Sequence, residues 1–550
     1  MNAVDNNFVG KLAAWGLGTR KGRAYEFLLG ALGALGFAPF YISPITVIVL
    51  VLFGLRLHQL QQSGGGFKLG FKTGWVFAFG FFLAGLFWIG SAFTMRPGGY
   101  VYLMVPMVGG LIAVLSLFWA AATGFLLRRK PSSPRVPIWA FAIKFACLIF
   151  IAEYARGHVL GGLPWNLPGY IIEAGHPLSQ ISSVVGIYGQ SLLVLLLVAF
   201  VMIGLSGGQL KQRVLGFGLA GSLVMGLWGF GVARLPNTQA EVYPDATLRL
   251  VVVDFNQKDQ FDPAKNVEIV REFLRQSVSP GFEDVTHVIW PEGAVSGLVI
   301  ENEPLLRAVG QTFSAARPQE PPVFIFNSLR HEQRTASDGR AKDVYYNTMA
   351  EVNFDGFGTP QLIGFNDKTR LVPFGEFIPF ADRLEAIGLG TLSAAIGSMT
   401  PGDEKRLFNI TGLPEVNSLI CYEGIFPDVS RNISDEAKWI LNLSNDGWYG
   451  RLTGPFQHAN QTRYRSIETG LPLVRSSAGG ETGVYDSYGR VIYASSSRAS
   501  RVMDVSIPRE VVKINSEIQN EEFLLLITLL LLLIVILMGR GLFSSTHFGA

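Results

Sequence analysis

The chain has 550 residues, of which 49% are hydrophobic and only 16% are charged. Soluble domains typically carry about 25% charged residues, so this composition indicates a membrane protein, and the length indicates at least two domains. The net charge of +3 is too small to indicate a nucleic-acid partner, and two cysteines cannot build a disulfide framework.

The first half of the chain is a succession of apolar runs joined by basic connectors. By length and apolar character, each run is interpreted as a transmembrane helix. The predicted spans are 24–41, 43–57, 73–94, 101–127, 136–155, 182–206, 214–233 and 523–539. The first two are short and are joined by a tight turn from Phe37 to Pro44, so seven spans or a re-entrant first pair remain alternatives. No small-residue cleavage site follows the basic amino terminus, so no cleaved signal peptide is expected.

Lysine and arginine cluster in alternate connectors between these runs. The connectors before the first run and after the second, fourth and sixth runs are basic, whereas the others carry few charges. The positive-inside rule therefore predicts cytoplasmic termini and an extracytoplasmic segment from 234 to 522. The residues behind this prediction include Arg20, Lys21, Arg23, Arg56, Lys68, Lys72, Arg128, Arg129, Lys130, Arg135, Lys211 and Arg213.

The segment from 234 to 522 has the pattern of an α/β domain. Short runs rich in β-branched and aromatic residues, such as 248–254 and 285–292, alternate with helical stretches near 263–277 and 303–316. The short runs are typical of buried strands in a largely covered sheet, and the longer stretches are typical of helices packed on it.

Three polar residues stand at the ends of apolar strands in this domain, namely Glu292, Lys368 and Cys421. A cysteine thiol with a pKa near 8.5 needs a base or a nearby cation to act as a nucleophile at neutral pH. A carboxylate can take its proton, and a lysine can stabilise the thiolate and then the oxyanion of a tetrahedral intermediate. The three residues are therefore sufficient for acyl transfer through a thioester. From the pattern alone a structural interpretation stays open, in which Glu292 and Lys368 are surface charges and Cys421 is a small buried apolar residue.

Several longer motifs carry a resemblance to a known family. Trp290-Pro-Glu292, Asp367-Lys368 with the following Leu-Val-Pro-Phe-Gly-Glu376, and Cys421-Tyr-Glu423 resemble the three catalytic blocks of the nitrilase superfamily, in the expected order. The segments 371–379, 442–449 and 454–458 are similar to motifs of its membrane-bound branch, apolipoprotein N-acyltransferase. The likeness extends over essentially the whole chain.

The resemblance implies a fold and a division into domains. It implies an integral membrane bundle of about eight helices and an extracytoplasmic nitrilase-like α/β domain, an α-β-β-α sandwich. The expected domains are a helical bundle at 1–233, a periplasmic catalytic domain at 234–522 and a final transmembrane helix with a cytoplasmic tail at 523–550.

The resemblance also implies roles for single residues. Glu292 is expected to be the general base, Lys368 the oxyanion stabiliser and Cys421 the nucleophile. Glu376 is the second carboxylate that nitrilase-like sites place beside the lysine. The family pattern further implies that Tyr422 and Glu423 line the pocket entrance.

The implied reaction is a two-stage acyl transfer in the inner membrane of a bacterium. Cys421 takes a fatty acyl chain from a phospholipid, and the α-amino group of an S-diacylglyceryl cysteine at the amino terminus of a lipoprotein then takes it from the thioester. Ping-pong kinetics follow from such an intermediate. The expected partners are phospholipid, diacylglyceryl apolipoproteins and membrane lipids. No cofactor, metal or nucleic acid is expected, and the enzyme is expected to be a monomer.

Apolar segments within the soluble domain are interpreted as lids that dip into the lipid interface, with ordinary core packing as the alternative. Their candidate residues are Phe377, Phe380, Leu389, Leu392 and Ile396. In the loop after the fifth span, Trp165 is a candidate substrate contact, although interfacial tryptophans are more often membrane anchors. Glu153 and Arg156 in the same region have the spacing of a helical ion pair.

Two alternatives to acyl transfer to lipoproteins remain. One is a membrane-tethered amidase in which water resolves the thioester, and the other is an inactive scaffold that binds lipoproteins. His458 has no metal-ligand spacing with Asp446 or Glu481 and is expected to be a structural hydrogen-bonding residue. A phosphate headgroup is one candidate partner of Arg463, Arg465 and Arg475, but ion pairs with acidic residues of the domain are the favoured interpretation.

Overall fold

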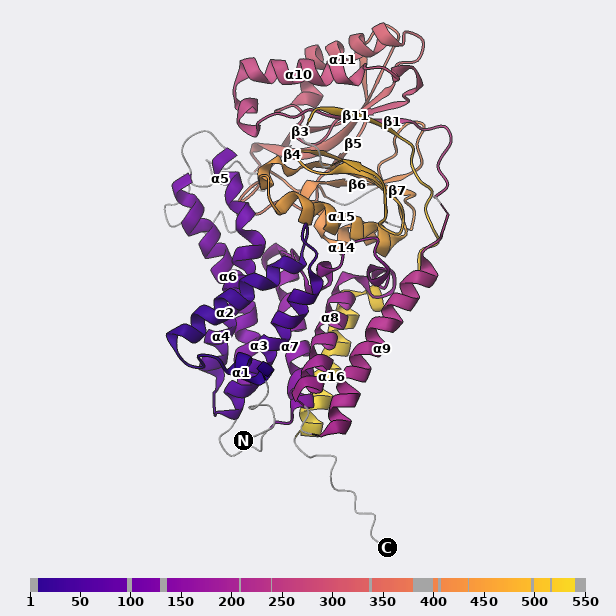
Figure 1. Ribbon diagram of the computed structural model, residues 1–550. Helices are drawn as coiled ribbons and strands as arrows, with labels where there is room; N and C mark the ends of the chain where they lie inside the picture. The colour runs from indigo at the N-terminus through magenta and orange to yellow at the C-terminus, as the bar shows by residue number, and fades with distance from the viewer. Residues whose placement is uncertain are drawn as a thin grey trace. The chain divides into compact units, whose positions relative to one another are not determined.

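The computed structural model describes residues 8–95, 101–128, 136–206, 209–238, 240–335, 339–378, 399–403, 407–433, 435–495, 499–514 and 517–539. The chain divides into two compact units (Figure 1). A helical unit comprises residues 1–90, 101–236 and 514–550, and a sandwich unit comprises residues 91–100 and 237–513.

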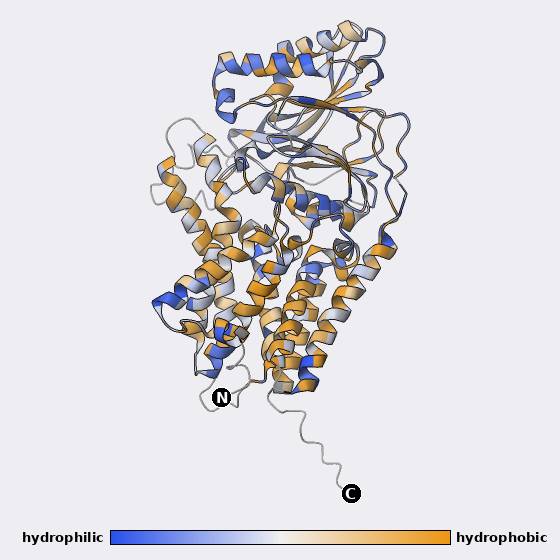
Figure 2. Cartoon of the chain, in the orientation of Figure 1, coloured by the Kyte–Doolittle hydropathy of each residue, from blue (hydrophilic) through white to orange (hydrophobic). Residues whose placement is uncertain are grey.

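The helical unit is built from long apolar helices. Its helices are α1 (Phe8–Ala14), α2 (Arg20–Gly33), α3 (Ser43–Gln62), α4 (Phe67–Leu86), α6 (Val101–Leu127), α7 (Ile138–His158), α8 (Ser182–Ser206), α9 (Leu210–Arg234) and α16 (Glu521–Gly539). Within the described chain, seven helical stretches are long and apolar enough to cross a membrane. Figure 2 shows hydrophobic residues along most of the length of these helices.

The first predicted span, 24–41, differs from the structure in its bounds. Helix α2 begins at Arg20 and ends at Gly33, and the 3-10 turn Ala34–Gly36 continues its helical path. This path is shorter than the seven long apolar helical stretches of the described chain and lies at the lower limit of the roughly 17–25 residues of a transmembrane helix. An eighth crossing by this segment stays a prediction.

Although short, α2 packs closely against α4. A Cβ atom added to Gly30 would lie 2.0 Å from the carbonyl oxygen of Phe77, and one added to Gly80 would lie 2.1 Å from that of Phe27. Glycines on both helices thus let the two backbones come into contact, as small residues do in membrane helix pairs.

Two buried ion pairs connect parts of the helical unit. Arg56 of α3 donates from Nε to Glu26 of α2 over 2.8 Å, and it also donates to backbone carbonyl oxygens near α1. Glu153 and Arg156 form the predicted pair within α7, and the indole N–H of Trp119 donates to the same carboxylate.

The sandwich unit contains two sheets. The first has the strand order β11-β1-β2-β3-β4-β5 and the second has the order β10-β9-β8-β7-β6. The first-sheet strands are β1 (Leu248–Val252), β2 (His287–Ile289), β3 (Val323–Thr335), β4 (Ala341–Phe354), β5 (Pro360–Asp367) and β11 (Arg501–Val505). Those of the second are β6 (Val416–Ile420), β7 (Trp439–Asn445), β8 (Leu473–Ala478), β9 (Thr482–Tyr485) and β10 (Val491–Ser495).

Helices cover the outer face of each sheet, which gives the predicted α-β-β-α order of layers. Helices α10 (Pro263–Ser277) and α11 (Glu303–Ala316) lie on the first sheet, and α14 (Pro427–Arg431) and α15 (Gly454–Thr469) lie on the second (Figure 1). One apolar core lies between the sheets, where Leu250 and Ile325 of the first meet Leu441 and Val474 of the second. A second core packs the first sheet against α10 and α11.

Candidate active site

The three strand-end residues meet in one buried site of the sandwich unit. Glu292 follows β2, Lys368 follows β5 directly, and Cys421 follows β6 directly. All three are at most 9% exposed. The interpretation of Glu292 and Lys368 as solvated surface charges therefore does not describe this structure.

Asn347, in the middle of β4, connects the two carboxylates of the site. Its Nδ2 group donates to Glu292 Oε1 and to Glu376 Oε1, each over 2.9 Å. Glu376 Oε1 also accepts from Lys368 Nζ over 2.8 Å. The backbones of the two residues are connected as well, because the Lys368 N–H donates to the Asn347 carbonyl oxygen over 2.8 Å.

Glu292 is also held from the second sheet. Its Oε2 atom accepts from the backbone N–H of Asn445, at the end of β7, over 2.9 Å. Asn445 Nδ2 donates in turn to Gln257 over 3.1 Å. Both oxygens of Glu292 therefore have fixed partners, and the carboxylate cannot rotate freely.

Cys421 has a backbone conformation that is unusual for a residue with a side chain. Its φ is +47°, in the left-handed region, and it opens a 3-10 turn, Cys421–Ile425. Such positions typically cost about 1–3 kcal/mol and are common at catalytic residues. The strand β6 is buried and extended, so this sharp change of direction places the thiol at the strand end.

The pKa values of the site follow from burial and from its charges. Burial raises the pKa of Glu292, and the charge of Glu376 adds to this, while Lys368 opposes it. Burial by itself lowers the pKa of Lys368, but the charges of Glu376 and Glu292 outweigh it and leave the pKa above its ordinary value. Burial, followed by the charge of Glu292, raises the pKa of the Cys421 thiol to about 12. The resting site therefore holds a neutral thiol and a charged lysine.

Glu423, which was expected to line the pocket entrance, is fully buried. Its Oε1 atom accepts from the backbone N–H and the hydroxyl of Thr369, each over 2.8 Å, and its Oε2 atom accepts from the backbone N–H of Ile420 over 2.9 Å. Glu423 thus ties the loop after Lys368 to the turn that carries Cys421. Tyr422 is 6% exposed and packs edge-on against Phe426.

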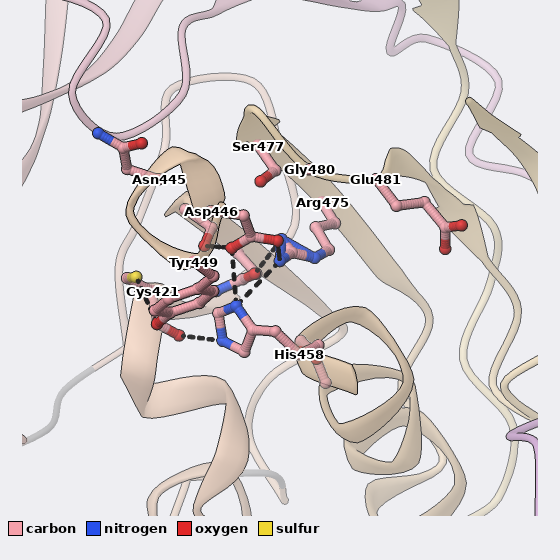
Figure 3. A network of polar contacts seen from close by, with 12 residues as sticks. Cys421, Asn445, Asp446, Tyr449, His458, Arg475, Ser477, Gly480 and Glu481 are labelled. Atoms are coloured by element: carbon pink, nitrogen blue, oxygen red, sulfur yellow. Dashed lines mark hydrogen bonds and ion pairs between the residues drawn. The ribbon is translucent and has the colours of Figure 1, made fainter. Parts of the chain in front are cut away.

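A second buried cluster lies beneath the turn of Cys421 (Figure 3). Asp446 pairs with Arg475 over 2.6 Å and with Nδ1 of His458 over 2.8 Å. The Nε2 atom of His458 lies 3.1 Å from the carbonyl oxygen of Cys421. The predicted structural role of His458 and the predicted ion pairing of Arg475 are confirmed by these contacts.

The predicted lid and substrate-contact residues lie only partly within the described chain. Phe377 is half-buried, and its carbonyl oxygen accepts from the backbone N–H of Phe374 over 2.7 Å. Trp165 is buried in the helical unit and packs against Trp88 with ring centroids 4.7 Å apart. The other lid candidates, Phe380, Leu389, Leu392 and Ile396, lie outside the described residues.

Asn347 and Tyr449 were not among the predicted site residues. The hydroxyl of Tyr449 lies 3.5 Å from the sulfur of Cys421. Asn347 lies in a strand that carries several other polar residues, so its residue type gave no signal for a function. Tyr449 ends one of the motifs that carried the family resemblance.

Two family models match the chain, one in each half. The model described as "Apolipoprotein N-acyltransferase N-terminal domain" matches residues 29–200, within the helical unit. The model described as "Carbon-nitrogen hydrolase" matches residues 250–513, within the sandwich unit.

Full-length relatives extend this likeness over both units. The apolipoprotein N-acyltransferase of Rhodopseudomonas palustris is 31% identical over 516 residues, which cover 91% of this chain and 92% of that protein. The enzyme of the same name from Allorhizobium ampelinum is 32% identical over 475 residues, covering 84% and 85%. That from Caulobacter vibrioides is 31% identical over 494 residues, covering 88% and 89%.

Proposed function

The chain belongs to the apolipoprotein N-acyltransferase family, and from that premise we propose that Cys421 carries a fatty acyl chain as a thioester between a phospholipid donor and a lipoprotein acceptor. The observation behind this proposal is the buried site that Glu292, Lys368 and Cys421 share. Asn347 and Glu376 connect Glu292 to Lys368, and both of these charged residues act on the pKa of the Cys421 thiol, which Glu292 raises and Lys368 lowers. A base, a cation and a nucleophile so arranged are what acyl transfer through cysteine requires.

The first half-reaction loads the enzyme. Glu292 takes the proton of the Cys421 thiol as the sulfur attacks the ester carbonyl carbon of the phospholipid. The charged Lys368 stabilises the oxyanion of the tetrahedral intermediate. When the C–O bond of the ester breaks, Glu292 returns the proton to the leaving alkoxide, and a lysophospholipid departs. The acyl chain remains as a thioester on Cys421.

The second half-reaction unloads it. The free α-amino group of an S-diacylglyceryl cysteine attacks the thioester carbonyl, and Glu292 accepts the proton that the nitrogen loses. The C–S bond then breaks, the electron pair returns to the sulfur, and the proton on Glu292 restores the thiol. The product is an N-acylated lipoprotein, and the enzyme is back in its starting state.

The two carboxylates have different environments, which suits different roles. Glu376 accepts a hydrogen bond from Lys368 and holds that lysine in the charged form. Glu292 receives its hydrogen bonds from Asn347 and the Asn445 backbone, and burial raises its pKa toward the range in which a carboxylate exchanges protons at neutral pH. Glu292 is therefore the base, and Glu376 orients the lysine through their hydrogen bond.

The substrates explain why the enzyme has a membrane unit. Both carry acyl chains, and drawing a chain out of the bilayer into water costs about 0.8 kcal/mol per methylene. We propose that the sandwich unit faces the periplasm, that both termini are cytoplasmic, and that the domains divide at 1–233, 234–522 and 523–550. A monomer without a cofactor is sufficient for this chemistry.

Intact-mass analysis of the purified full-length protein tests the proposal. After incubation with phospholipid, wild type is expected to gain a fatty acyl mass that hydroxylamine removes. The variant Cys421→Ala is expected to gain none, and Cys147→Ala, which changes the buried cysteine of α7, is expected to behave as wild type.

The fate of that acyl group separates the alternatives. Addition of a synthetic diacylated lipopeptide is expected to discharge the thioester and to place the acyl chain on the amino group of the peptide. Release as free fatty acid in the presence of the peptide would indicate a hydrolase. Loading of Cys421→Ala to the level of wild type would overturn the proposal.

A further inference from the structure

The turn after β7 places a tyrosine hydroxyl beside the candidate nucleophile. Tyr449 ends the 3-10 turn Asp446–Tyr449, and its hydroxyl lies 3.5 Å from Cys421 Sγ (Figure 3). Strands β6 and β7 are parallel neighbours, with Ile420 paired to Leu443. The contact therefore follows from the topology, because residues that follow adjacent parallel strands leave the sheet at the same edge.

The Tyr449 ring is held by the buried cluster of Asp446, His458 and Arg475. It packs edge-on against the His458 ring with centroids 5.3 Å apart. His458 contacts Asp446 through Nδ1 and the Cys421 carbonyl oxygen through Nε2. The same imidazole thus touches both the turn that carries the thiol and the ring that faces it, so the sulfur and the hydroxyl share one rigid support.

The direction of the hydrogen bond depends on the charge of the sulfur. Burial, followed by the nearby charges of Cys421 and Asp446, raises the pKa of Tyr449 well above its ordinary value, so the phenol keeps its proton. A thiolate has no proton and can only accept. Once the sulfur is ionised, the hydroxyl of Tyr449 is therefore the donor.

We propose that Tyr449 is a further catalytic residue, whose hydroxyl donates a hydrogen bond to the Cys421 sulfur whenever that sulfur carries negative charge. This rests on the thioester chemistry proposed above. The charge arises twice: when Glu292 removes the thiol proton, and when the C–S bond breaks and its electron pair returns to sulfur. The phenol keeps its proton in both steps, so no further reactant is required.

The hydrogen bond from Tyr449 stabilises the Cys421 sulfur mainly when that sulfur is charged. A thioester sulfur is a weak acceptor, whereas a thiolate is a strong one, so the hydrogen bond strengthens as charge develops. Interactions that are stronger in the transition state than in the ground state are those that accelerate a reaction. The charge of Lys368 and the backbone N–H of Asn445 also favour the ionised sulfur, because both lower the pKa of the Cys421 thiol. Tyr449 adds a side-chain hydroxyl that lies within hydrogen-bond distance of the sulfur itself.

The variant Tyr449→Phe tests this, because it removes one oxygen and keeps the ring. The control is Tyr485→Phe, which changes a buried tyrosine of the sandwich unit whose hydroxyl donates to Glu481 over 2.6 Å. Alkylation of Cys421 by iodoacetamide at pH 8, followed by peptide mass mapping of the full-length protein, reports the reactivity of the sulfur without any lipid.

The size of the effect can be bounded. Loss of a hydrogen bond to a charged group is expected to lower the thiolate fraction roughly ten- to a hundredfold. The less stabilised thiolate is more nucleophilic, which recovers about half of that loss on a logarithmic scale. Tyr449→Phe should therefore alkylate roughly three- to tenfold more slowly, and Tyr485→Phe at the wild-type rate. Single-turnover loading and discharge of the acyl group should slow in the same variant.

A second variant guards against misfolding. Replacing Tyr449 with 3-fluorotyrosine keeps the shape and makes the phenol a stronger donor, so alkylation is expected to accelerate. Equal alkylation rates in wild type, Tyr449→Phe and the fluorinated protein would overturn the inference. If wild type forms no acyl-enzyme but Tyr449→Phe still slows alkylation, the proposed function fails while the contact of Tyr449 with the sulfur stands.

Discussion

At the scale of single residues, the site is organised by how charges are distributed around Lys368. The lysine is buried and has a carboxylate partner in Glu376, while the second carboxylate, Glu292, is bound by neutral amides instead. A buried ammonium group without a partner would lose its proton, because burial penalises the charged form. We therefore propose that Glu376 acts through Lys368 and does not itself touch the substrate.

This arrangement predicts the behaviour of Glu376→Gln. The charge of Glu376 raises the pKa of Lys368, so its removal lowers that pKa. Lysine is active in its protonated form, so the alkaline limb of the pH profile for acyl-enzyme formation should move to lower pH. At neutral pH we expect a loss no larger than the roughly hundredfold that follows removal of an oxyanion donor.

Single-turnover loading of Cys421, measured from pH 6 to 10, checks this expectation. The matched control is Glu272→Gln on helix α10, where the carboxylate bonds Arg275 on the outer surface and the pH profile should not change. An unchanged alkaline limb in Glu376→Gln would mean that Lys368 does not depend on this carboxylate for its charge.

The sequence was sufficient for Glu292, Lys368, Cys421 and Glu376 to be predicted as one site, because their motifs follow strands and are specific to a family. Asn347 and Tyr449 were missed for a physical reason. Each acts through contacts across neighbouring strands, β4 with β5 and β7 with β6. The strand order that creates these contacts cannot be read from the local pattern of any one strand.

At the scale of elements, helix periodicity predicted the ends of helices more accurately than hydropathy did. The stretches 263–277 and 303–316 coincide with α10 and α11, because a proline or acidic start and an amphipathic face mark both helices. The run 24–41 differs from the structure at both ends, because helix α2 begins at Arg20 and the helical path ends at Gly36, while the apolar sequence continues to Tyr41. Apolar composition alone does not show where a backbone stops being helical.

The close packing of α2 against α4 leads to a prediction for Gly30→Ala. The added methyl group would lie 2.0 Å from the Phe77 carbonyl oxygen, so the helices must separate. Overpacking of this kind costs about 1–3 kcal/mol. Gly110→Ala on α6 is the matched control, because no atom lies within 4 Å of its added Cβ, and alanine should stabilise that helix by about 0.5–1 kcal/mol.

Thermal unfolding in detergent distinguishes these two glycines. Gly30→Ala is expected to lower the midpoint and Gly110→Ala to leave it unchanged or raise it. Equal midpoints for the two variants would show that α2 and α4 are free to move apart without loss of stability.

At the scale of the whole molecule, the α/β sandwich lies in sequence between long apolar helices. Seven apolar helices flank it in sequence, six before it and one after, so its two ends both connect to the bilayer. The number of crossings before the sandwich determines the side on which it lies. The basic connectors predict a cytoplasmic amino terminus, and six crossings before residue 237 would leave the sandwich on that same side. A periplasmic sandwich therefore requires the short α2 segment to cross as well, because a re-entrant segment would not change sides.

Cysteine labelling in intact cells decides this question of sidedness. We expect the sandwich unit to be periplasmic, so that a cysteine placed at Phe357, a side chain that is 87% exposed, reacts with a membrane-impermeant maleimide. A cysteine at Lys211, exposed at the start of α9 and within a basic connector, should react only after the cells are permeabilised. Wild type is the background control, because Cys147 and Cys421 are both buried. Labelling of Lys211→Cys but not Phe357→Cys in intact cells would place the active site in the cytoplasm, away from the lipoproteins that a periplasmic enzyme is proposed to acylate.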